Sequence, residues 1–288
     1  MPTVEDLLKQ ARFFLTQSGS TTPSLDARLI VQDAMALDHA TVIAEPERAA
    51  SASEVNRIEY LLKRRCDGEP LSRLFGVREF YGVDFKVTPA VLDPRPDTEH
   101  LAHAALNSGR GLSEDNYTYL DLGTGSGAVA IIIALQQPGV RVVAIDVSAA
   151  ALVVARENAV AHGVDDRIAF MQSDWFSKVK GKFNVIVSNP PYIPTGDIAD
   201  LARDVKDYDP VLALDGGTDG LACYRRIAAE AAQHLFANGV VIVEIGSGQA
   251  DAVSAIFKRH GFRINYAYAD LAGLTRGIAF DMLDQPDN

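Results

Sequence analysis

Up to residue 74 the apolar side chains recur at helical spacing, and no alternating pattern typical of strands occurs. Three helices are predicted there, over residues 4–15, from Ser24 onward and over residues 53–66. Gly19 and the sequence TTPS shortly after it separate the first two helices, and Ser53 is the expected cap of the third. A small N-terminal helical domain is therefore predicted for residues 1–74.

Between residues 75 and 93 the spacing of the apolar residues is no longer helical. The sequence REFYGVDFKV carries strand-like residues on both sides of a Tyr-Gly pair, which predicts a β-hairpin. We assign residues 75–93 as a hairpin linker. A helix is expected to follow, capped by Asp97 or Thr98 and running through Ala105.

From Tyr117 onward apolar strands alternate with helices. Strands are predicted over residues 117–123, 141–146, 167–174, 183–189 and 239–246, and helices over residues 128–136, 148–162, 220–235 and 251–260. The tail, residues 262–283, is expected to supply two closing strands. This alternation predicts an α/β fold over residues 94–288, a doubly wound, mostly parallel sheet with helices on both faces.

The amino-acid composition limits which binding partners and which cellular compartment can be expected. The net charge is −11, which is the wrong sign for non-specific gripping of a nucleic-acid backbone and leaves only a local basic patch open. The two cysteines, Cys66 and Cys223, form no disulfide framework and no CxxC pattern, which is typical of a cytosolic protein. The first residues do not resemble a signal peptide or anchor, and no stretch approaches the roughly 20 apolar residues of a membrane span.

A glycine-rich loop follows the first strand of the alternating region. The sequence DLGTGSG, residues 121–127, leads into a helix, and its glycines allow a tight turn and a close approach to a ligand. Asp146 ends the next strand, where a carboxylate can accept from both hydroxyls of a ribose. Beyond a plain tight turn, the pattern therefore predicts a nucleoside cofactor, either NAD or S-adenosylmethionine. The expected contacts are Gly123, Thr124, Gly125, Ser126, Gly127 and Asp146.

Three further residues favour the methyl donor over NAD. Asp121 stands immediately before the loop, where a cationic sulfonium or ammonium group would sit. Asp174, in the sequence QSDWF, is expected to accept from the adenine amino group. Trp175 either covers the adenine ring or packs in the core. No site for hydride transfer is evident.

The fourth strand ends in the sequence NPPY, residues 189–192. Ligands of open α/β sheets bind beyond the carboxyl ends of the strands, so this motif is expected to face the glycine loop. Each proline fixes its own φ and extends the residue before it, so the backbone is preset. The Asn189 side-chain oxygen and the Pro190 carbonyl then offer two acceptors to one NH₂ group, and Tyr192 offers a flat face.

An NH₂ group on an sp² carbon matches these two acceptors. Its lone pair is delocalised, and acceptors on both hydrogens can orient it for in-line methyl transfer. The motif alone leaves a carboxamide and an exocyclic base amine both open as substrates. Asn189, Pro190 and Tyr192 are the candidate catalytic residues.

The segments SLDARLIV, LFGVREFYGVDFKV, PRPDTE, DLGTGSGAVA, QSDWF, NPPYI, LALDGGTDGLACYRRI and VEIGSGQ span nearly the whole chain. Together they resemble the HemK-type protein methyltransferases, also called PrmC or release-factor glutamine methyltransferases. NPPY alone is shared with adenine-N6 and other amino methyltransferases. PRPDTE combined with NPPY and GGTDGL is much more specific.

The resemblance implies a Rossmann-like domain that transfers methyl from S-adenosylmethionine to the N5 of the glutamine in the Gly-Gly-Gln motif of class 1 peptide chain release factors. S-adenosylhomocysteine would be the product, and no metal is implied. By position, residues 123–127, Asp146 and Trp175 would hold the cofactor, and Asn189 would be shared with the substrate. Asn189, Pro190, Pro191 and Tyr192 would form the glutamine pocket, and the helical domain would help to dock the release factor.

The chain departs from the family pattern in two places. It reads LDPRP at residues 92–96 where many members have Ile-Pro-Arg-Pro, and it has Asp209 where glutamate is common. Roles for Asp93 and Asp209 are therefore not carried over.

Two groups of polar residues stay outside the catalytic set. Arg95, Asp97 and Glu99 are either a capped, solvated helix start or charges that hold the linker as a gate over the cofactor. His100 and His103 have HxxH spacing on a predicted helix, but a metal site needs further ligands, so a solvated face is expected.

The alternative prediction is an adenine-N6 DNA or RNA methyltransferase that uses the same NPPY pocket. The net charge and the lack of an evident basic recognition domain count against it. A nicotinamide-dependent oxidoreductase and a non-catalytic cofactor-binding protein are further alternatives. The partners expected are class 1 release factors, with no membrane, no stable nucleic-acid binding, a monomeric state and a cytoplasmic location.

Overall fold

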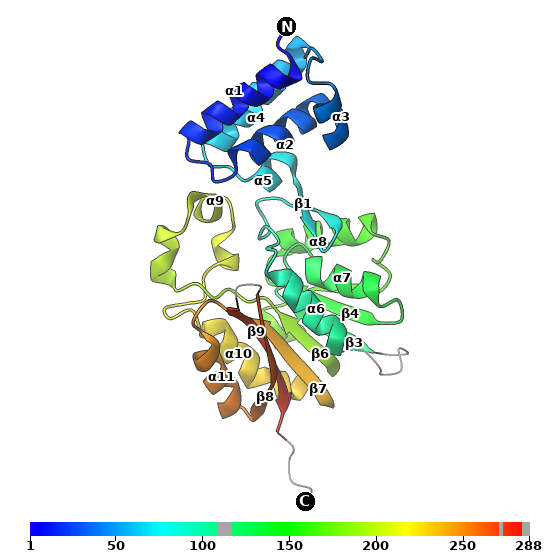
Figure 1. Ribbon diagram of the computed structural model, residues 1–288. Helices are drawn as coiled ribbons and strands as arrows, with labels where there is room; N and C mark the ends of the chain where they lie inside the picture. Colours follow the sequence, from blue (N-terminus) through cyan, green and yellow to red (C-terminus); the bar gives the residue numbers. More distant parts are fainter. Residues whose placement is uncertain (109–116, 271–272, 284–288) are drawn as a thin grey trace, which may run out of the picture. The chain divides into compact units, whose positions relative to one another are not determined.

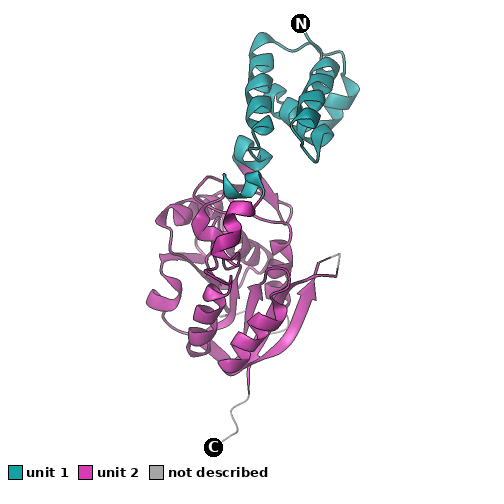
Figure 2. Ribbon diagram, turned by 90° about the vertical axis from the view of Figure 1, so that its left-hand side faces the viewer, with its two compact units in different colours: residues 1–76, 202–208 teal, residues 77–201, 209–288 magenta. Residues whose placement is uncertain are grey.

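The structure is a computed structural model that describes residues 1–108, 117–270 and 273–283. Its residues pack into two compact units (Figure 2). Unit 1 comprises residues 1–76 together with 202–208, and unit 2 comprises residues 77–201 and 209–288. The boundaries drawn from the sequence at residues 74 and 93 stay a prediction. By packing, the hairpin belongs to unit 2, and the short stretch 202–208 belongs to unit 1.

Unit 1 is helical. Its helices are α1 (Val4–Gln17), α2 (Pro23–Met35), α3 (His39–Ala44), α4 (Ala52–Cys66), α5 (Leu71–Phe75) and, from the second stretch, α9 (Arg203–Lys206). α1, α2 and α4 lie side by side and enclose an aliphatic core that includes Leu15, Ile30 and Leu61 (Figure 1). The three helices expected from the apolar pattern are confirmed. α3 and α5 were missed because six and five residues are too few to show a period.

The cap expected at Ser53 is wrong. Ser51 caps α4 instead: its hydroxyl accepts from the backbone N–H of Glu54 at 3.3 Å, and the Glu54 carboxylate accepts from the Ser51 N–H at 2.6 Å. Such a reciprocal pair requires serine and glutamate three positions apart, a spacing that Ser51 satisfies and Ser53 does not.

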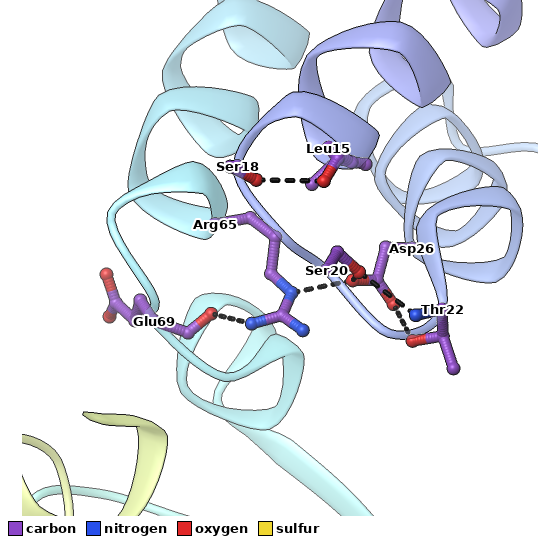
Figure 3. Close-up of polar contacts among 7 residues, drawn as sticks. All are labelled: Leu15, Ser18, Ser20, Thr22, Asp26, Arg65 and Glu69. Atoms are coloured by element: carbon purple, nitrogen blue, oxygen red, sulfur yellow. Dashed lines mark hydrogen bonds and ion pairs between the residues drawn. The ribbon is translucent and has the colours of Figure 1, made fainter. Parts of the chain in front are cut away.

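A buried carboxylate ties α2 to α4 and to the loop between α1 and α2 (Figure 3). Asp26 on α2 is 1% exposed and accepts from the hydroxyls of Ser20 and Thr22 at 2.9 and 2.7 Å and from Nε of Arg65 at 2.8 Å. Arg65, at the end of α4, also donates to the Glu69 carbonyl at 3.2 Å. A buried ion pair stabilises a fold only when its remaining polar atoms are satisfied, as they are here. The aspartate of SLDARLIV therefore has a structural role.

Unit 2 is built on a seven-stranded sheet in the order β5-β4-β3-β6-β7-β9-β8. The strands are β3 (Thr118–Leu122), β4 (Arg141–Asp146), β5 (Ile168–Gln172), β6 (Phe183–Ser188), β7 (Leu235–Glu244), β8 (Phe262–Ala269) and β9 (Thr275–Met282). The first five in spatial order run parallel, and β9 is antiparallel to both neighbours. The predicted doubly wound, mostly parallel sheet with two closing strands is confirmed. The hairpin β1 (Val77–Phe80) and β2 (Val83–Lys86) forms a separate small sheet.

Helices cover both faces of the sheet (Figure 1). α6 (Thr98–Ser108), α7 (Ala128–Gln136) and α8 (Ala149–Ala161) pack on one face, and α10 (Ala222–Ala231) and α11 (Ala250–Arg259) on the other. The helix predicted over residues 220–235 is too long. α10 ends at Ala231, and Leu235 already belongs to β7, where it is buried and pairs with Phe183. Within the described ranges, no helix is long and apolar enough to cross a membrane.

The strand order reverses at β3, whose neighbours are β4 and β6. Leu122 of β3 pairs with Ile145 of β4 and with Ser188 of β6, so the three strands end at the same edge. Crevices beyond the carboxyl ends at such a reversal are where α/β sheets bind ligands. The glycine loop, Asp146 and NPPY all emerge there.

Candidate active site

The glycine loop leaves β3 with three residues in the left-handed region. Gly123, Gly125 and Gly127 have φ of 75°, 55° and 82°. A side chain at Gly123 or Gly125 would meet no atom within 4 Å, because both face open space, whereas one at Gly127 would press on Ala155 at 3.1 Å. The first two glycines therefore leave room for a ligand, and the third allows α7 to pack against α8.

Asp146 fastens this loop. Its carboxylate accepts from the N–H of Gly125 at 2.9 Å and from the N–H of Ser148 at 2.8 Å. Burial raises the pKa of Asp146, and these N–H groups lower it in part. Each carboxylate oxygen keeps a second lone pair for a further donor such as a ribose hydroxyl.

A cavity of about 410 Å³ opens beside the loop. Every one of its lining residues belongs to unit 2, and they include Val91, Leu92, Gly123, Gly125, Asp146, Asp174, Trp175, Asn189, Pro191, Leu212, Cys223 and Arg226. A smaller cavity of about 60 Å³ is lined by Thr98, Asp121, the glycine loop, including Thr124 and Ser126, and Asn189. Asn189 borders both. Of the predicted site residues, Gly127, Pro190 and Tyr192 line neither cavity, and the others line one or both.

Asp174 lies in the cavity wall with its carboxylate already paired. Arg226 of α10 donates to both carboxylate oxygens, at 2.9 and 3.0 Å. An adenine amino group would have to share this acceptor with the guanidinium. This ion pair could not be predicted from the sequence, because the two residues are 52 positions apart and meet only when α10 packs over the end of β5.

Trp175 follows with a φ of 48°, rare for a bulky residue. Its side chain packs against the core cluster beneath α10 and also lines the cavity. The two roles that the sequence left open, core packing and cover for a ring, are therefore compatible.

NPPY follows β6 with its acceptors free of backbone partners. The Asn189 side-chain nitrogen donates to Oγ1 of Thr98 at 3.0 Å. In the described part of the chain, no hydrogen bond ends on the Pro190 carbonyl. Burial raises the pKa of Tyr192 to about 12, so its hydroxyl stays neutral near physiological pH.

The segment GGTDGL, residues 216–221, contacts the backbone of NPPY and of the residue after it. The N–H of Gly216 donates to the Ile193 carbonyl at 2.8 Å, and Nε2 of Gln249 lies between the carbonyls of Tyr192 and Gly220, at 3.0 and 3.3 Å. A side chain at Gly216 would meet Cα of Tyr192 at 2.8 Å, and one at Gly220 would meet the Tyr192 carbonyl oxygen at 2.4 Å. These two glycines let the segment approach the motif closely and hold it.

Asp121 is the buried charge of the site. It is 2% exposed, and its carboxylate accepts from the Thr124 hydroxyl at 2.6 Å. Burial raises the pKa of Asp121 to about 7; the Thr124 hydrogen bond lowers it, and the nearby Asp146 raises it further. A cation that entered the small cavity would therefore find a carboxylate at its wall.

Two family models match the sequence. Residues 6–76 match the PrmC N-terminal domain and residues 109–204 the Methyltransferase small domain. The release factor glutamine methyltransferase of Agrobacterium fabrum is 41% identical over 280 residues, which cover 96% of this chain and 97% of that protein. The chain belongs to the release factor glutamine methyltransferase family.

Other similar proteins agree with this membership. The release factor glutamine methyltransferase of Geobacter sulfurreducens is 36% identical over 96% of this chain and 95% of its own length. Among solved structures, the hMettl16 catalytic domain in complex with an RNA hairpin gives a TM-score of 0.58 at 15% identity, covering 72% of this chain and 78% of that one. A methyltransferase from Pyrococcus furiosus gives 0.51 at 18%, covering 78% and 97%. These two structures show the fold alone.

In this methyltransferase the charges of PRPDTE are paired. Arg95 forms an ion pair with Asp209, and Asp209 also accepts from the N–H of Asp93 at 3.2 Å. Asp97 pairs with Arg276 of β9 at 3.3 Å, and Glu99 accepts from the N–H of Tyr81 at 2.9 Å. Of the two roles considered for Arg95, Asp97 and Glu99, these contacts favour holding the segment in place.

The two histidines of the HxxH spacing do not line the cavity beside the glycine loop. His100 and His103 line a surface hollow together with Asp97 and Asp270. Among the described residues, no group of three or more histidine, cysteine or acidic side chains is arranged to hold a metal ion.

Several residues near the site of this methyltransferase were not predicted from the sequence to have a functional role. Glu244 and Gln249 stand in VEIGSGQ, and Thr98 was considered only as a helix cap. A glutamate that ends the apolar run VVIVE is a signal that was available, because charged residues in buried strands are rare without a partner. Cys223 also lines the cavity; burial raises its pKa to about 11, so the thiol stays protonated and unreactive near neutral pH.

Proposed function

We propose that this protein transfers a methyl group from S-adenosylmethionine to the N5 of the glutamine in the Gly-Gly-Gln motif of class 1 peptide chain release factors. The observation that supports this proposal is that NPPY follows β6 beside β3, and that Asn189 lines the same cavity as Gly123 and Gly125 of the glycine loop. Family membership supplies the substrate class, because the curated relatives are named for it.

The residues around the cavity suit S-adenosylmethionine. Gly123 and Gly125 leave space for backbone contact, and Asp121 offers a buried carboxylate to a cation. We propose that Asp146 takes the ribose and that Asp174 and Trp175 take the adenine. Thr124, Ser126 and Gly127 complete the loop around the ligand. Bound S-adenosylmethionine supplies an activated methyl group on a sulfonium.

The glutamine side chain is proposed to lie between NPPY and the cofactor. Asn189 Oδ1 and the Pro190 carbonyl accept the two N–H bonds of its amide, Pro191 and Tyr192 enclose its plane, and the lone pair is aimed at the methyl group. The amide nitrogen loses its proton after the C–N bond forms, so no strong base has to stand beside it. Preset backbone geometry therefore accounts for most of the catalysis.

The test is direct. The full chain is incubated with methyl-labelled S-adenosylmethionine and a class 1 release factor, and the modified residue is mapped by mass spectrometry. One added methyl on the Gly-Gly-Gln glutamine is expected, and none on a release factor in which that glutamine is replaced by alanine. Label on DNA or RNA adenine with none on the release factor would overturn the proposal.

We propose that the enzyme is cytoplasmic and that its partner is the release-factor protein. We propose that the helical unit 1 takes part in docking, that the enzyme acts as a monomer, and that it needs neither a membrane nor stably bound nucleic acid. Light scattering of the free chain and of its mixture with the release factor would test the stoichiometry.

Binding of S-adenosylmethionine is expected to release a proton from Asp121. Its pKa is raised to about 7 by burial, and a nearby cation favours the ionised form and lowers that pKa. The complex then binds fewer protons than the free protein, so affinity should rise with pH up to about 7 and level off above it. The sole tryptophan, Trp175, lines the cavity, so its fluorescence reports the Kd.

Asp121→Asn is the matched control for this titration. It keeps the size of the side chain and removes the titrating group, so its Kd should vary little between pH 5.5 and 8.5. A Kd for the natural protein that is equally flat over this range would contradict the assignment of Asp121 to the cation.

A further inference from the structure

The direction of one carboxamide decides whether NPPY can hold an amide substrate. Asn189 must turn its oxygen, an acceptor, toward the cavity, because its nitrogen can only donate. A carboxamide has nearly the same shape after a half turn, so shape alone does not fix this direction. Some polar partner behind Asn189 has to fix it.

The first such partner is Thr98. Its Oγ1 lies 3.0 Å from the Asn189 side-chain nitrogen, and the residue is 6% exposed at the start of α6. A hydroxyl both donates and accepts, however, so Thr98 alone would bond equally well to the nitrogen or to the oxygen of Asn189. A group beyond Thr98 must settle which role the hydroxyl takes.

Glu244 is that group. It ends β7, and because Ser188 pairs with Val243, it stands beside Asn189 across the two parallel strands. It is 2% exposed, and the nearby Thr98 hydroxyl and Asn189 carboxamide lower its pKa, as polar donors near a carboxylate do. Its Oε2 has no hydrogen-bond partner among the described residues, so the carboxyl has unused acceptor capacity.

An ionised carboxylate only accepts. A Thr98 hydroxyl that donates toward this carboxylate keeps its oxygen free to accept from the Asn189 nitrogen, the contact seen at 3.0 Å. The Asn189 oxygen is left for the cavity. We propose that Glu244 and Thr98 are positioning residues that fix the Asn189 carboxamide with its oxygen toward the substrate. The inference rests on the proposed function for the identity of that substrate.

The charge state of Glu244 sets the conditions of a test. Burial raises its pKa to about 7, Thr98 and Arg276 and the Asn189 carboxamide lower it, and Asp97 raises it. Tyr192, Tyr224 and Tyr268 also lie close enough for their own pKa values to respond to its charge. Assays at pH 8 keep the carboxylate ionised.

The experiment compares Glu244→Gln, Thr98→Val and Thr98→Ser in the full chain. Glutamine keeps the size of Glu244 but adds an N–H donor, which can reverse the Thr98 hydroxyl and let Asn189 turn over. Glu244→Gln and Thr98→Val should lower kcat for release-factor methylation about 10- to 100-fold, the scale expected for a misplaced catalytic contact. The Kd for S-adenosylmethionine, read from Trp175, should change less than threefold. Thr98→Ser keeps the hydroxyl and should restore most of the rate, and Glu230→Gln on α10 is the matched control.

A second readout separates positioning from general damage. In an Asn189→Ala background, Glu244→Gln should lower kcat no further, because its effect passes through Asn189. An equal loss in both backgrounds, or a full rate in Glu244→Gln, would overturn the inference.

A third readout does not depend on the substrate. In protein labelled with ¹⁵N-asparagine, the Asn189 side-chain NH₂ should exchange slowly with water and should exchange faster in Glu244→Gln. If the natural protein shows this protection but methylates no release factor, the proposed function fails and the positioning holds. If the exchange is the same in both proteins while the natural protein is active, the positioning fails alone.

Discussion

Asn189→Ala should remove nearly all methyl transfer while the protein stays folded and still binds S-adenosylmethionine. The variant loses the side-chain acceptor that we propose for one hydrogen of the glutamine amide. Loss of a single preorganised polar contact to a reacting group commonly lowers kcat by about 10²- to 10³-fold. We expect that range here, measured with saturating release factor and S-adenosylmethionine.

The same preparation provides the controls for this variant. The Kd for S-adenosylmethionine, followed by Trp175 fluorescence, should weaken less than tenfold, since Asn189 is one of many residues that line the cavity. Asn265→Ala, the same substitution at an exposed position of β8, should leave kcat unchanged. Full methylation by Asn189→Ala would remove Asn189 from the catalytic set.

Gly220→Ala should be strongly destabilising and should also lower the rate of methyl transfer. The residue has a φ of 71°, and an added Cβ would lie 2.4 Å from the Tyr192 carbonyl oxygen and 2.8 Å from Nε2 of Gln249. The left-handed backbone costs an alanine about 1 kcal/mol, and overpacking a close contact typically costs another 1–3 kcal/mol. The free energy of unfolding should therefore fall by about 2–4 kcal/mol, and displacement of Tyr192 should lower kcat at least tenfold.

Gly163→Ala separates strain from contact. Gly163 has a φ of 65° at the end of α8, and an added Cβ would meet nothing within 4 Å. It should lose only about 1 kcal/mol and keep its full rate. Urea unfolding followed by Trp175 emission measures both variants in unit 2. Equal stabilities and equal rates for the two would show that the contact with Tyr192 does not matter.

The architecture of unit 2 was readable from the sequence because local and global signals agree there. Each parallel strand is a short apolar run that ends in a recognisable turn, and the glycine loop and NPPY mark two strand ends. Alternation of strands and helices then leaves few topologies. The closing strands were readable for the same reason, although the start of β7 at Leu235 was hidden by an apolar run that also suits a helix.

The parts of the site that could not be read depend on which strands are neighbours. Glu244 matters only because β7 lies beside β6 in a register that pairs Val243 with Ser188. Arg226 reaches Asp174 only because α10 packs over the end of β5. Neither relation leaves a trace in local spacing, since the residues are far apart in sequence. Gly220 belongs to the motif GGTDGL, but the need for a glycine at this position comes from the closeness of the Tyr192 backbone, which exists only in the folded chain.

The place of α9 has a consequence for how the protein is made. Arg203 at its start lies within 4 Å of where a side chain on Gly68 would stand, and residues 202–208 count among the contacts of unit 1. Chains emerge from the ribosome amino end first, and domains usually fold as they appear. Here the last piece of the amino-terminal unit, residues 202–208, is synthesised only after residues 77–201 have been added to the chain. The nascent helical unit therefore stays incomplete while most of the parallel sheet is translated. A fragment that ends at residue 76 would lack residues 202–208, the final segment of this unit.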